Sequence, residues 1–202
     1  MDFSPVDTTS EYLDLPLRGF LDLVASGRPA PGGGSVAAIA VALAAGLSGM
    51  AARLSAGQLV DAEGLADRAD AARRRVAPLA RIDAESYGRV LDAYREPDSE
   101  IRRERVSDAL SGATDVPLAV AEIGHEVAGI AARLVEEGNP NLEGDAIAAV
   151  LLAEAGVRAA TVLVEINLSS ANVEDDRLGR ANKLVDKTAS TARRVTGGDR
   201  RG

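Results

Sequence analysis

The sequence contains no cysteine and no tryptophan, and its only histidine is His125. The absence of cysteine excludes disulfides, zinc–thiolate sites, iron–sulfur clusters and cysteine nucleophiles. A single histidine excludes a metal site built from several histidines of one chain, and it excludes any Ser-His-Asp triad that does not use His125. We therefore expect no metal site, and the candidates for acid–base chemistry are carboxylates and this one imidazole.

Aromatic residues are also scarce, since the 202 residues include two Phe and three Tyr. Alanine, in contrast, occurs 38 times. A core of Ala, Leu and Val with few aromatics favours closely packed helices over strands, which are rich in β-branched and aromatic residues. The net charge of −8 argues against a sequence-independent nucleic-acid partner, because such a partner needs a net basic face.

The first five residues have neither a basic start nor an apolar run, so we expect no secretory signal. Residues 29–52 carry no charge and are long enough to cross a bilayer, but they are mostly Ala and Gly and open with two prolines and three glycines. We expect this segment to be a buried helix of a cytoplasmic protein with no membrane partner.

Helix signals occur along almost the whole chain, and no internal repeat or linker divides it. The sequence predicts an all-α fold, a single-domain bundle of about five to seven helices with long buried Ala/Gly-rich helices, and flexible ends at residues 1–12 and 197–202. Gly46 and Gly49 lie inside the first of these apolar helices and are expected to allow close approach of another helix backbone. The expected helices span residues 16–24, 35–54, 61–94, 99–111, 115–137, 145–168 and 172–195.

The most unusual motif is the turn Pro31-Gly32-Gly33-Gly34-Ser35 that leads into the first apolar helix. Ser35 is a good N-cap residue, and the free N–H groups and dipole of a helix start suit an anion. The spacing also matches a dinucleotide fingerprint, but that fingerprint requires a preceding strand, and residues 20–25 read as a helix. The turn is either a tight connection between helices or a ligand-binding turn.

Four polar residues in the predicted helices are candidates for chemistry. Asp83 shares a helix face with Tyr87 and has apolar neighbours, so it is either a general base or a solvated carboxylate. His125 is followed by Glu126, and a lone histidine is more often structural than catalytic. Asp145 is a candidate N-cap for the second apolar helix, and Asn167, near the end of that helix, is either a local cap or a ligand contact.

These segments together resemble the cyclodeaminase/cyclohydrolase family, which includes the C-terminal domain of formiminotransferase-cyclodeaminase and stand-alone methenyltetrahydrofolate cyclohydrolases. The resemblance covers roughly residues 14–190. Its motifs are APGGGSVAA at 30–38, DAESY at 83–87 followed by DAY at 92–94 and Pro97, TDVPLA at 114–119, and the run from Gly138-Asn139 through Gly144-Asp145 and AGVR at 155–158 to Ile166-Asn167.

The resemblance implies an all-helical homodimer that binds a reduced folate and needs no prosthetic group, with a tetrahydrofolate derivative as its substrate. The implied reaction is either hydrolysis of 5,10-methenyltetrahydrofolate to 10-formyltetrahydrofolate or deamination of 5-formiminotetrahydrofolate to the methenyl compound. Asp83 matches the family's helix aspartate and is the candidate catalytic residue. The residues that match substrate-binding positions are Gly32, Gly33, Gly34, Ser35, Asp145 and Asn167.

The sequence departs from the family pattern at two positions. Family members commonly have a lysine where this chain has Gln58, and an asparagine in the region of Leu163. Glutamine cannot supply the charge of a lysine. We favour the cyclohydrolase reaction because no formiminotransferase domain accompanies these residues, and the alternative is a non-catalytic folate-binding or dimeric scaffold protein of the same fold. Because the chain is acidic overall, a folate would need a local positive site, for which Arg28 and Arg53 are the sequence candidates.

Overall fold

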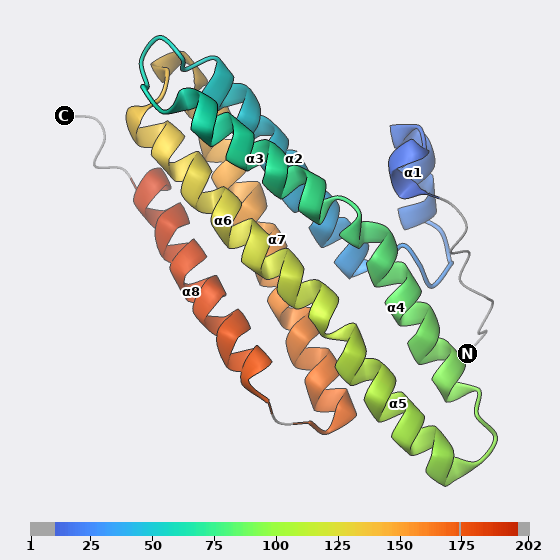
Figure 1. Ribbon diagram of the computed structural model, residues 1–202. Coiled ribbons are helices and arrows are strands. Elements are labelled where there is room, and N and C mark those ends of the chain that lie inside the picture. Colours follow the sequence, from blue (N-terminus) through green and yellow to red (C-terminus); the bar gives the residue numbers. More distant parts are fainter. Residues whose placement is uncertain (1–10, 174, 198–202) are drawn as a thin grey trace.

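Helices make up all the regular structure in the described part of the computed structural model, which comprises residues 11–173 and 175–197 (Figure 1). The all-α prediction is confirmed. Two short 3₁₀ segments, Tyr12–Asp14 and Pro140–Leu142, accompany the α-helices. The α-helices in this part of the chain are α1 (Leu17–Val24), α2 (Gly33–Arg53), α3 (Ala62–Val76), α4 (Leu79–Tyr94), α5 (Ser99–Ala113), α6 (Asp115–Glu137), α7 (Glu143–Ala171) and α8 (Asp176–Thr196).

The predicted helix at 61–94 is two helices, α3 and α4, which run nearly end to end (Figure 1). The break falls at Ala77 and Pro78, and Pro78 is the N-cap residue of α4. Proline has no N–H for the hydrogen bond of a continuous helix, and its ring clashes with the preceding turn. The prediction of one helix was wrong because it followed the apolar spacing across this proline.

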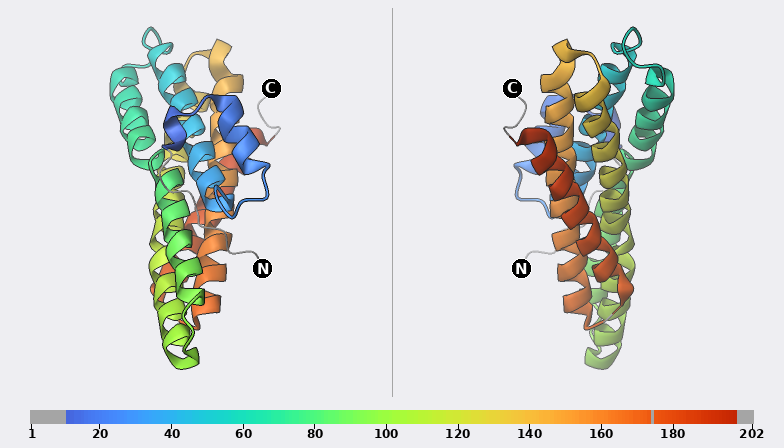
Figure 2. Two further views of the ribbon diagram at one scale, coloured as in Figure 1. Left: turned by 90° about the vertical axis from the view of Figure 1, so that its right-hand side faces the viewer. Right: turned by 90° about the vertical axis from the view of Figure 1, so that its left-hand side faces the viewer.

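The centre of the bundle is the antiparallel pair α2 and α7, with α6 packed against both (Figures 1 and 2). The two helices approach each other closely at Gly156, where an added Cβ would lie 2.5 Å from Val41 Cγ2 and 3.2 Å from the carbonyl oxygen of Ala37. Gly124 on α6 is similarly tight, with Val157 Cγ2 at 2.6 Å from its ideal Cβ. Close helix approach therefore depends on these two glycines.

Gly46 and Gly49, which were expected to allow close approach of another helix backbone, contribute less to helix packing. An added Cβ at Gly46 would meet only a side-chain carbon of Arg73, at 3.9 Å. At Gly49 the nearest atom is a guanidinium nitrogen of Arg53, at 3.1 Å, and the Cβ of Ala69 on α3 is at 3.7 Å. The expectation of a close backbone contact at Gly46 is therefore wrong, and at Gly49 the approach is to a side chain of α3.

The starts of the two apolar helices differ from the predictions by two residues each. α2 begins at Gly33 with Gly32 as its N-cap, so Ser35 is inside the first turn and does not cap the helix. α7 begins at Glu143 with Leu142 as its N-cap, so Asp145 is also inside the first turn. The prediction that Asp145 caps this helix is wrong, although a carboxylate in a first turn still complements the helix dipole.

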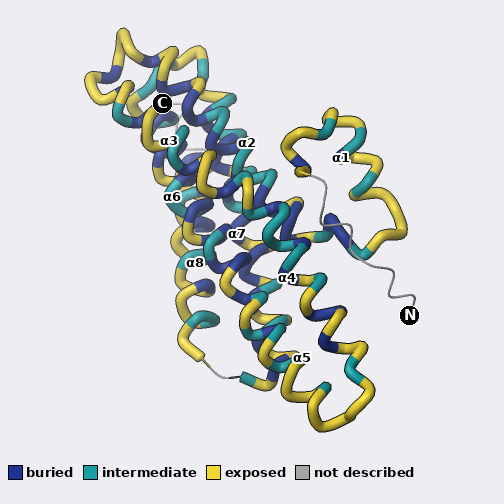
Figure 3. The backbone as a smooth tube through the Cα atoms, turned by 45° about the vertical axis from the view of Figure 1, so that its right-hand side comes forward, coloured by how far each residue is buried: buried dark blue, intermediate teal, exposed yellow. Residues whose placement is uncertain are grey.

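The short helix α1 stands apart from the bundle, beside α2 (Figure 3). Phe20 anchors it, because this side chain is buried and its ring makes an edge contact with Tyr12, with the two centroids 5.9 Å apart. The predicted flexible ends lie mostly outside the described residues, at 1–10 and 198–202, whereas Tyr12 is buried at 6% exposure.

Two helical segments, Gly33–Arg53 and Pro140–Ala171, are long and apolar enough to cross a membrane by length and composition. About half of each apolar window, 56% and 44% respectively, is buried inside the protein. Core helices of a soluble bundle pass the same test, and the neighbouring α3, α5 and α8 carry charged side chains along their lengths.

Candidate active site

A cavity of about 230 Å³ lies where the start of α2, the middle of α4, the junction of α5 and α6, and the last third of α7 meet. Segments that are far apart in the sequence therefore contribute to one site. Its lining residues are Pro29, Ala30, Gly32, Gly33, Gly34, Asp83, Ala84, Ser86, Tyr87, Val90, Ala113, Pro117, Leu163, Ile166 and Asn167.

The carboxylate of Asp83 lies directly against the first turn of α2. A Cβ at position 34 would be 2.0 Å from Asp83 Oδ1 and 2.7 Å from Oδ2, so only glycine leaves room for this carboxylate. The hydroxyl of Ser35 donates a hydrogen bond to Asp83 Oδ2 at 3.2 Å. The glycine-rich turn thus brings an acidic side chain of α4 to the positive end of the α2 dipole.

Burial raises the pKa of the Asp83 carboxyl above its ordinary value, because desolvation disfavours the charged form. Hydrogen bonds from the hydroxyl and the backbone N–H of Ser35 oppose this effect and lower the pKa, but burial is the larger cause. A carboxyl group whose pKa moves toward neutrality can both accept and donate a proton under physiological conditions. Asp83 therefore has the environment of a general acid–base group.

The position of Ser35 does not support the expectation that this residue contacts a ligand. Its side chain is fully buried, it does not line the cavity, and its hydroxyl also donates to the carbonyl oxygen of Ala80 at 2.7 Å. One hydroxyl proton cannot serve both acceptors fully at once. Ser35 therefore holds Asp83 in place and leaves ligand contact to Gly32, Gly33 and Gly34, which line the cavity.

Asn167 and Tyr87 are on opposite walls of the cavity, on α7 and α4. Among the described residues the Asn167 side chain has no hydrogen-bond partner, which favours a ligand contact over a local cap. The ring of Tyr87 is 45% exposed and offers an aromatic surface. Leu163, which stands where the family often has an asparagine, lines the cavity with an apolar side chain.

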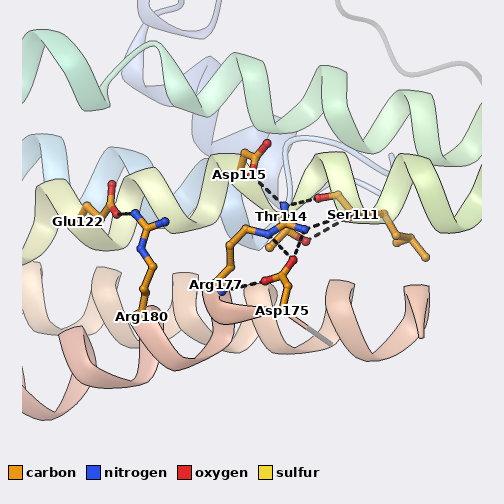
Figure 4. Close-up of polar contacts among 8 residues, drawn as sticks. Ser111, Thr114, Asp115, Glu122, Asp175, Arg177 and Arg180 are labelled. Atoms are coloured by element: carbon orange, nitrogen blue, oxygen red, sulfur yellow. Dashed lines mark hydrogen bonds and ion pairs between the residues drawn. The ribbon is translucent and has the colours of Figure 1, made fainter. Parts of the chain in front are cut away.

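The wall at the α5–α6 junction is held by a polar network that the sequence did not reveal (Figure 4). Arg177 on α8 donates to the carbonyl oxygen of Ser111 at 2.7 Å and to Asp115 Oδ1 at 2.8 Å, and it pairs with Asp175 at 2.6 Å. The hydroxyl of the buried Thr114 donates to the carbonyl oxygen of Leu110 at 3.0 Å. These contacts fix the segment that presents Ala113 and Pro117 to the cavity. No spacing in the sequence links Arg177 to this junction.

Asp145, which the resemblance assigned to the site, and Gln58, which replaces the family lysine, are at the other end of the bundle. Asp145 is 22 residues before Asn167 on α7, which corresponds to about 33 Å along a helix. Gln58 is in the exposed turn after α2, whose opposite end holds Gly33. Of the two arginine candidates, Arg28 adjoins the cavity residue Pro29, whereas Arg53 pairs with Asp70 at the far end of α2.

His125 is a structural residue in this arrangement. Its Nδ1 is 2.9 Å from the hydroxyl of Thr188 on α8, and it does not line the cavity. Burial, followed by the nearby Lys187, lowers the pKa of His125. Glu126 pairs with Arg75 at 2.9 Å. In the described ranges 11–173 and 175–197, no three His, Asp or Glu side chains are grouped as metal ligands would be.

The comparisons with known proteins agree with this arrangement. The family model described as formiminotransferase-cyclodeaminase matches residues 16–187. Methenyltetrahydrofolate cyclohydrolase of Methylorubrum extorquens is 33% identical over 193 residues, which cover 89% of this chain and 93% of that protein. Formimidoyltransferase-cyclodeaminase of Mus musculus is also 33% identical, and the match spans 82% of this chain but 35% of that longer protein.

A solved structure has the same fold. The crystal structure of formiminotetrahydrofolate cyclodeaminase from Thermotoga maritima superposes with a TM-score of 0.82 at 27% identity, covering 92% of this chain and 96% of the other. Likeness of this extent in both sequence and structure goes beyond a shared helical architecture. This chain belongs to the formiminotransferase-cyclodeaminase family.

Proposed function

We propose that this protein is a folate-dependent one-carbon enzyme that hydrolyses 5,10-methenyltetrahydrofolate to 10-formyltetrahydrofolate. The match over 93% of the length of a methenyltetrahydrofolate cyclohydrolase supports this choice of reaction. The observation that carries the proposal is the partly buried carboxyl of Asp83, held at the start of α2 in a cavity that Tyr87 and Asn167 also line.

The chemistry requires one group that alternates between base and acid. Water attacks the amidinium carbon, and Asp83 accepts a water proton as the C–O bond forms. The bond from that carbon to a ring nitrogen then breaks, and the protonated Asp83 donates the proton to the departing nitrogen. The second water proton leaves to solvent, so the cationic substrate and water give the neutral formyl product and one proton.

The test is the rate at which the purified protein removes the absorbance of methenyltetrahydrofolate near neutral pH, corrected for spontaneous hydrolysis. We expect Asp83→Asn to lower kcat by about 10²- to 10⁴-fold, because general acid–base help is of this size. The far-ultraviolet circular dichroism should stay unchanged, because asparagine has nearly the same shape.

The matched control is Asp67→Asn, which removes an exposed carboxylate on α3 outside the cavity. It should retain normal kcat. A near-normal kcat for Asp83→Asn would contradict the assignment, and a collapsed kcat for His125→Ala in the same experiment would move the role to the histidine.

The competing reaction is the deamination of 5-formiminotetrahydrofolate, in which the departing group is ammonia. The name of the Thermotoga structure supports testing it. The same assay run with 5-formiminotetrahydrofolate distinguishes the two, because deamination makes the methenyl absorbance rise. If neither substrate reacts while a reduced folate still binds, the protein is a non-catalytic folate-binding member of the family.

We further propose that the protein is a cytoplasmic homodimer without membrane or nucleic-acid partners. The dimer is supported by the apolar side chains that α2 and α7 leave exposed. Sedimentation at micromolar concentration should give twice the 20.8 kDa of one chain, and a species of one chain alone would contradict the dimer.

A further inference from the structure

A second cavity lies where α4 turns into α5 and α7 ends. Its volume is about 380 Å³, and none of the described residues that line it is an Asp or a Glu. Hydroxyl, amide and guanidinium groups can all donate hydrogen bonds, so this lining suits an anion. We call it the basic cavity, and its polar lining residues include Tyr94, Ser99, Arg102, Arg103, Ser107 and Asn172.

The basic cavity and the cavity of Asp83 follow one another along the same helices. From one to the other, the lining of α4 moves from Tyr87 to Tyr94, and the lining of α5 moves from Ala113 to Val106. Because α4 and α5 run antiparallel (Figure 1), these two shifts of seven residues have the same direction, and each spans about 10 Å. The two cavities are therefore neighbours along one groove, which α7 borders as well.

A tyrosine of α4 lines each cavity. Tyr87 and Tyr94 are seven residues apart, so both rings project from the same side of the helix. Their exposed fractions are 45 and 46%, which leaves aromatic surface open toward the groove. A ligand that spans both cavities can therefore lay a planar ring against one of these side chains.

Arg103 is a cation without a partner in its own chain. Among the described residues its guanidinium makes no hydrogen bond or ion pair, whereas Arg105, on the same helix, pairs with Glu96 at 2.6 Å. A guanidinium offers five N–H donors in a planar arrangement that fits a carboxylate. Arg103 can therefore receive an anionic group without first breaking an internal ion pair.

Arg102 is held in place by the backbone of the turn between α4 and α5. Its Nη1 donates to the carbonyl oxygens of Glu96 at 2.7 Å and of Pro97 at 3.3 Å. Both acceptors are neutral, so the positive charge of Arg102 stays uncompensated by these contacts. Two adjacent arginines thus provide a local positive site in a chain whose net charge is −8.

The C-terminal end of α7 also borders the basic cavity, and the negative end of a helix dipole disfavours an anion. Two hydrogen bonds reduce this effect. The hydroxyl of Ser107 donates to the carbonyl oxygen of Ala171 at 2.9 Å, and the backbone N–H of Val173 donates to that of Leu168 at 3.1 Å. Carbonyl oxygens with such partners repel an anion less than unpaired ones do.

We propose that the basic cavity binds the glutamate carboxylates of a reduced folate whose one-carbon unit reacts at Asp83. In such a molecule an aminobenzoyl ring and an amide bond separate the reacting carbon from the carboxylates, so two neighbouring cavities are needed. Arg103 takes a carboxylate, Arg102 adds the second positive charge, and the aminobenzoyl ring lies against Tyr87. The identity of this ligand rests on the proposed function.

Arg103→Gln tests the contact, because it removes the charge and keeps most of the length of the side chain. The KM for 5,10-methenyltetrahydrofolate should rise about 3- to 10-fold, as expected for a charge-assisted contact that stays open to water. The kcat should stay within about twofold, because the carboxylates are bound equally in the ground state and the transition state. An unchanged KM, or a loss confined to kcat, would overturn the proposal.

Arg68→Gln is the matched control, because it removes the same charge from an exposed position on α3 outside both cavities. Its KM and kcat should equal those of the wild type. Arg28→Gln tests the alternative site, since Arg28 adjoins the cavity residue Pro29 in sequence but lines neither cavity. A larger rise in KM for Arg28→Gln than for Arg103→Gln would place the carboxylates at the glycine-rich turn and overturn the proposal.

A substrate without the charges identifies the part of the ligand that Arg103 contacts. The substrate is 5,10-methenyltetrahydrofolate with both glutamate carboxylates converted to methyl esters. The wild type should show a raised KM for this ester, and Arg103→Gln should raise it no further, because the two changes remove the same interaction. An equal effect of Arg103→Gln on both substrates would contradict a contact with the carboxylates.

Inorganic phosphate distinguishes a free anion from the carboxylates of the substrate. If Arg103→Gln weakens inhibition by phosphate but leaves the KM for 5,10-methenyltetrahydrofolate unchanged, the basic cavity binds a free anion and the proposal is wrong. Weaker inhibition together with the raised KM supports it, because both anions then compete for the same arginine.

Equilibrium binding separates this proposal from that of the reaction. Calorimetric titration with 5-formyltetrahydrofolate, a reduced folate that needs no turnover, should give a Kd about 3- to 10-fold higher for Arg103→Gln than for the wild type. This result in a protein without cyclohydrolase activity would refute the proposed reaction and leave the carboxylate site standing. Normal activity with equal Kd values would refute the carboxylate site alone.

Discussion

At the scale of single residues, the hydrogen side chain of Gly34 makes room for the Asp83 carboxylate. We predict that Gly34→Ala reduces activity about as strongly as Asp83→Asn does, because the new Cβ would lie 2.0 Å from Asp83 Oδ1 and force the carboxylate away. The free energy of unfolding should fall by about 1–3 kcal/mol, as for other overpacked sites.

Gly33→Ala is the neighbouring control for this measurement. An added Cβ at position 33 meets nothing within 4 Å, so urea unfolding should show a change of less than about 1 kcal/mol. If both variants unfold at the same urea concentration as the wild type and Gly34→Ala keeps its kcat, the close contact with Asp83 is absent in solution.

The raised pKa of Asp83 also makes stability depend on pH. The native state binds a proton more tightly at this carboxyl than the unfolded chain does, so the free energy of unfolding falls as pH rises from the ordinary aspartate pKa through the raised one. We predict that Asp83→Asn abolishes this decline, so that the variant gains stability relative to the wild type as pH increases.

Urea unfolding at several pH values between 4 and 8 measures this difference. Asp67→Asn, at an exposed site, should run parallel to the wild type. A constant offset between Asp83→Asn and the wild type across this pH range would mean that the carboxyl titrates normally in the native state.

At the scale of helices, the sequence predicted where most of them lie, because apolar spacing and the prolines and glycines between segments are local signals. The errors also have local causes. Pro78 interrupts an apolar spacing that continues in register on both sides of it. Ser35 is a residue type that often caps a helix, but its hydroxyl here bonds to a carbonyl oxygen of α4. Which glycine allows close packing could not be predicted, because that depends on the crossing of α2, α6 and α7.

The crossing of these helices gives a prediction of its own. Gly156→Ala should lower the free energy of unfolding by about 1–3 kcal/mol, because its Cβ would lie 2.5 Å from Val41 Cγ2 and 3.2 Å from a backbone oxygen. Gly129→Ala in α6 has nothing within 4 Å and an exposed position, so it should stabilise by about 0.5–1 kcal/mol. Thermal or urea unfolding of both variants decides whether the α2–α7 contact is as tight as described.

At the scale of the whole molecule, the candidate site was only partly visible in the sequence. Gly32, Gly33, Gly34, Asp83 and Asn167 do line one cavity, but family motifs and not spacing linked them before the fold was known. The same motifs suggested Asp145, which the fold places about 33 Å away in its own chain. Arg177 acts through contacts between helices α5, α6 and α8, and such contacts leave no trace in local sequence patterns.

A dimer also has a thermodynamic signature. If two copies fold and associate together, the unfolding temperature rises with protein concentration. Between 1 and 100 µM the stabilisation changes by about 2.7 kcal/mol, which we expect to shift the midpoint by about 3 °C. Calorimetry at the two concentrations checks this, and a midpoint that does not change would indicate a monomeric unfolding unit.

The central pairing of α2 with α7 has a consequence for biosynthesis. α2 ends at Arg53 and α7 begins at Glu143, so 90 residues must be translated before the side of α2 that faces α7 can be covered. At about 5–20 residues per second, a nascent chain exposes this helix for roughly 5–20 s. Ribosome-associated chaperones would therefore meet α2 first, and the Asp83 cavity would close only as the last third of the chain emerges.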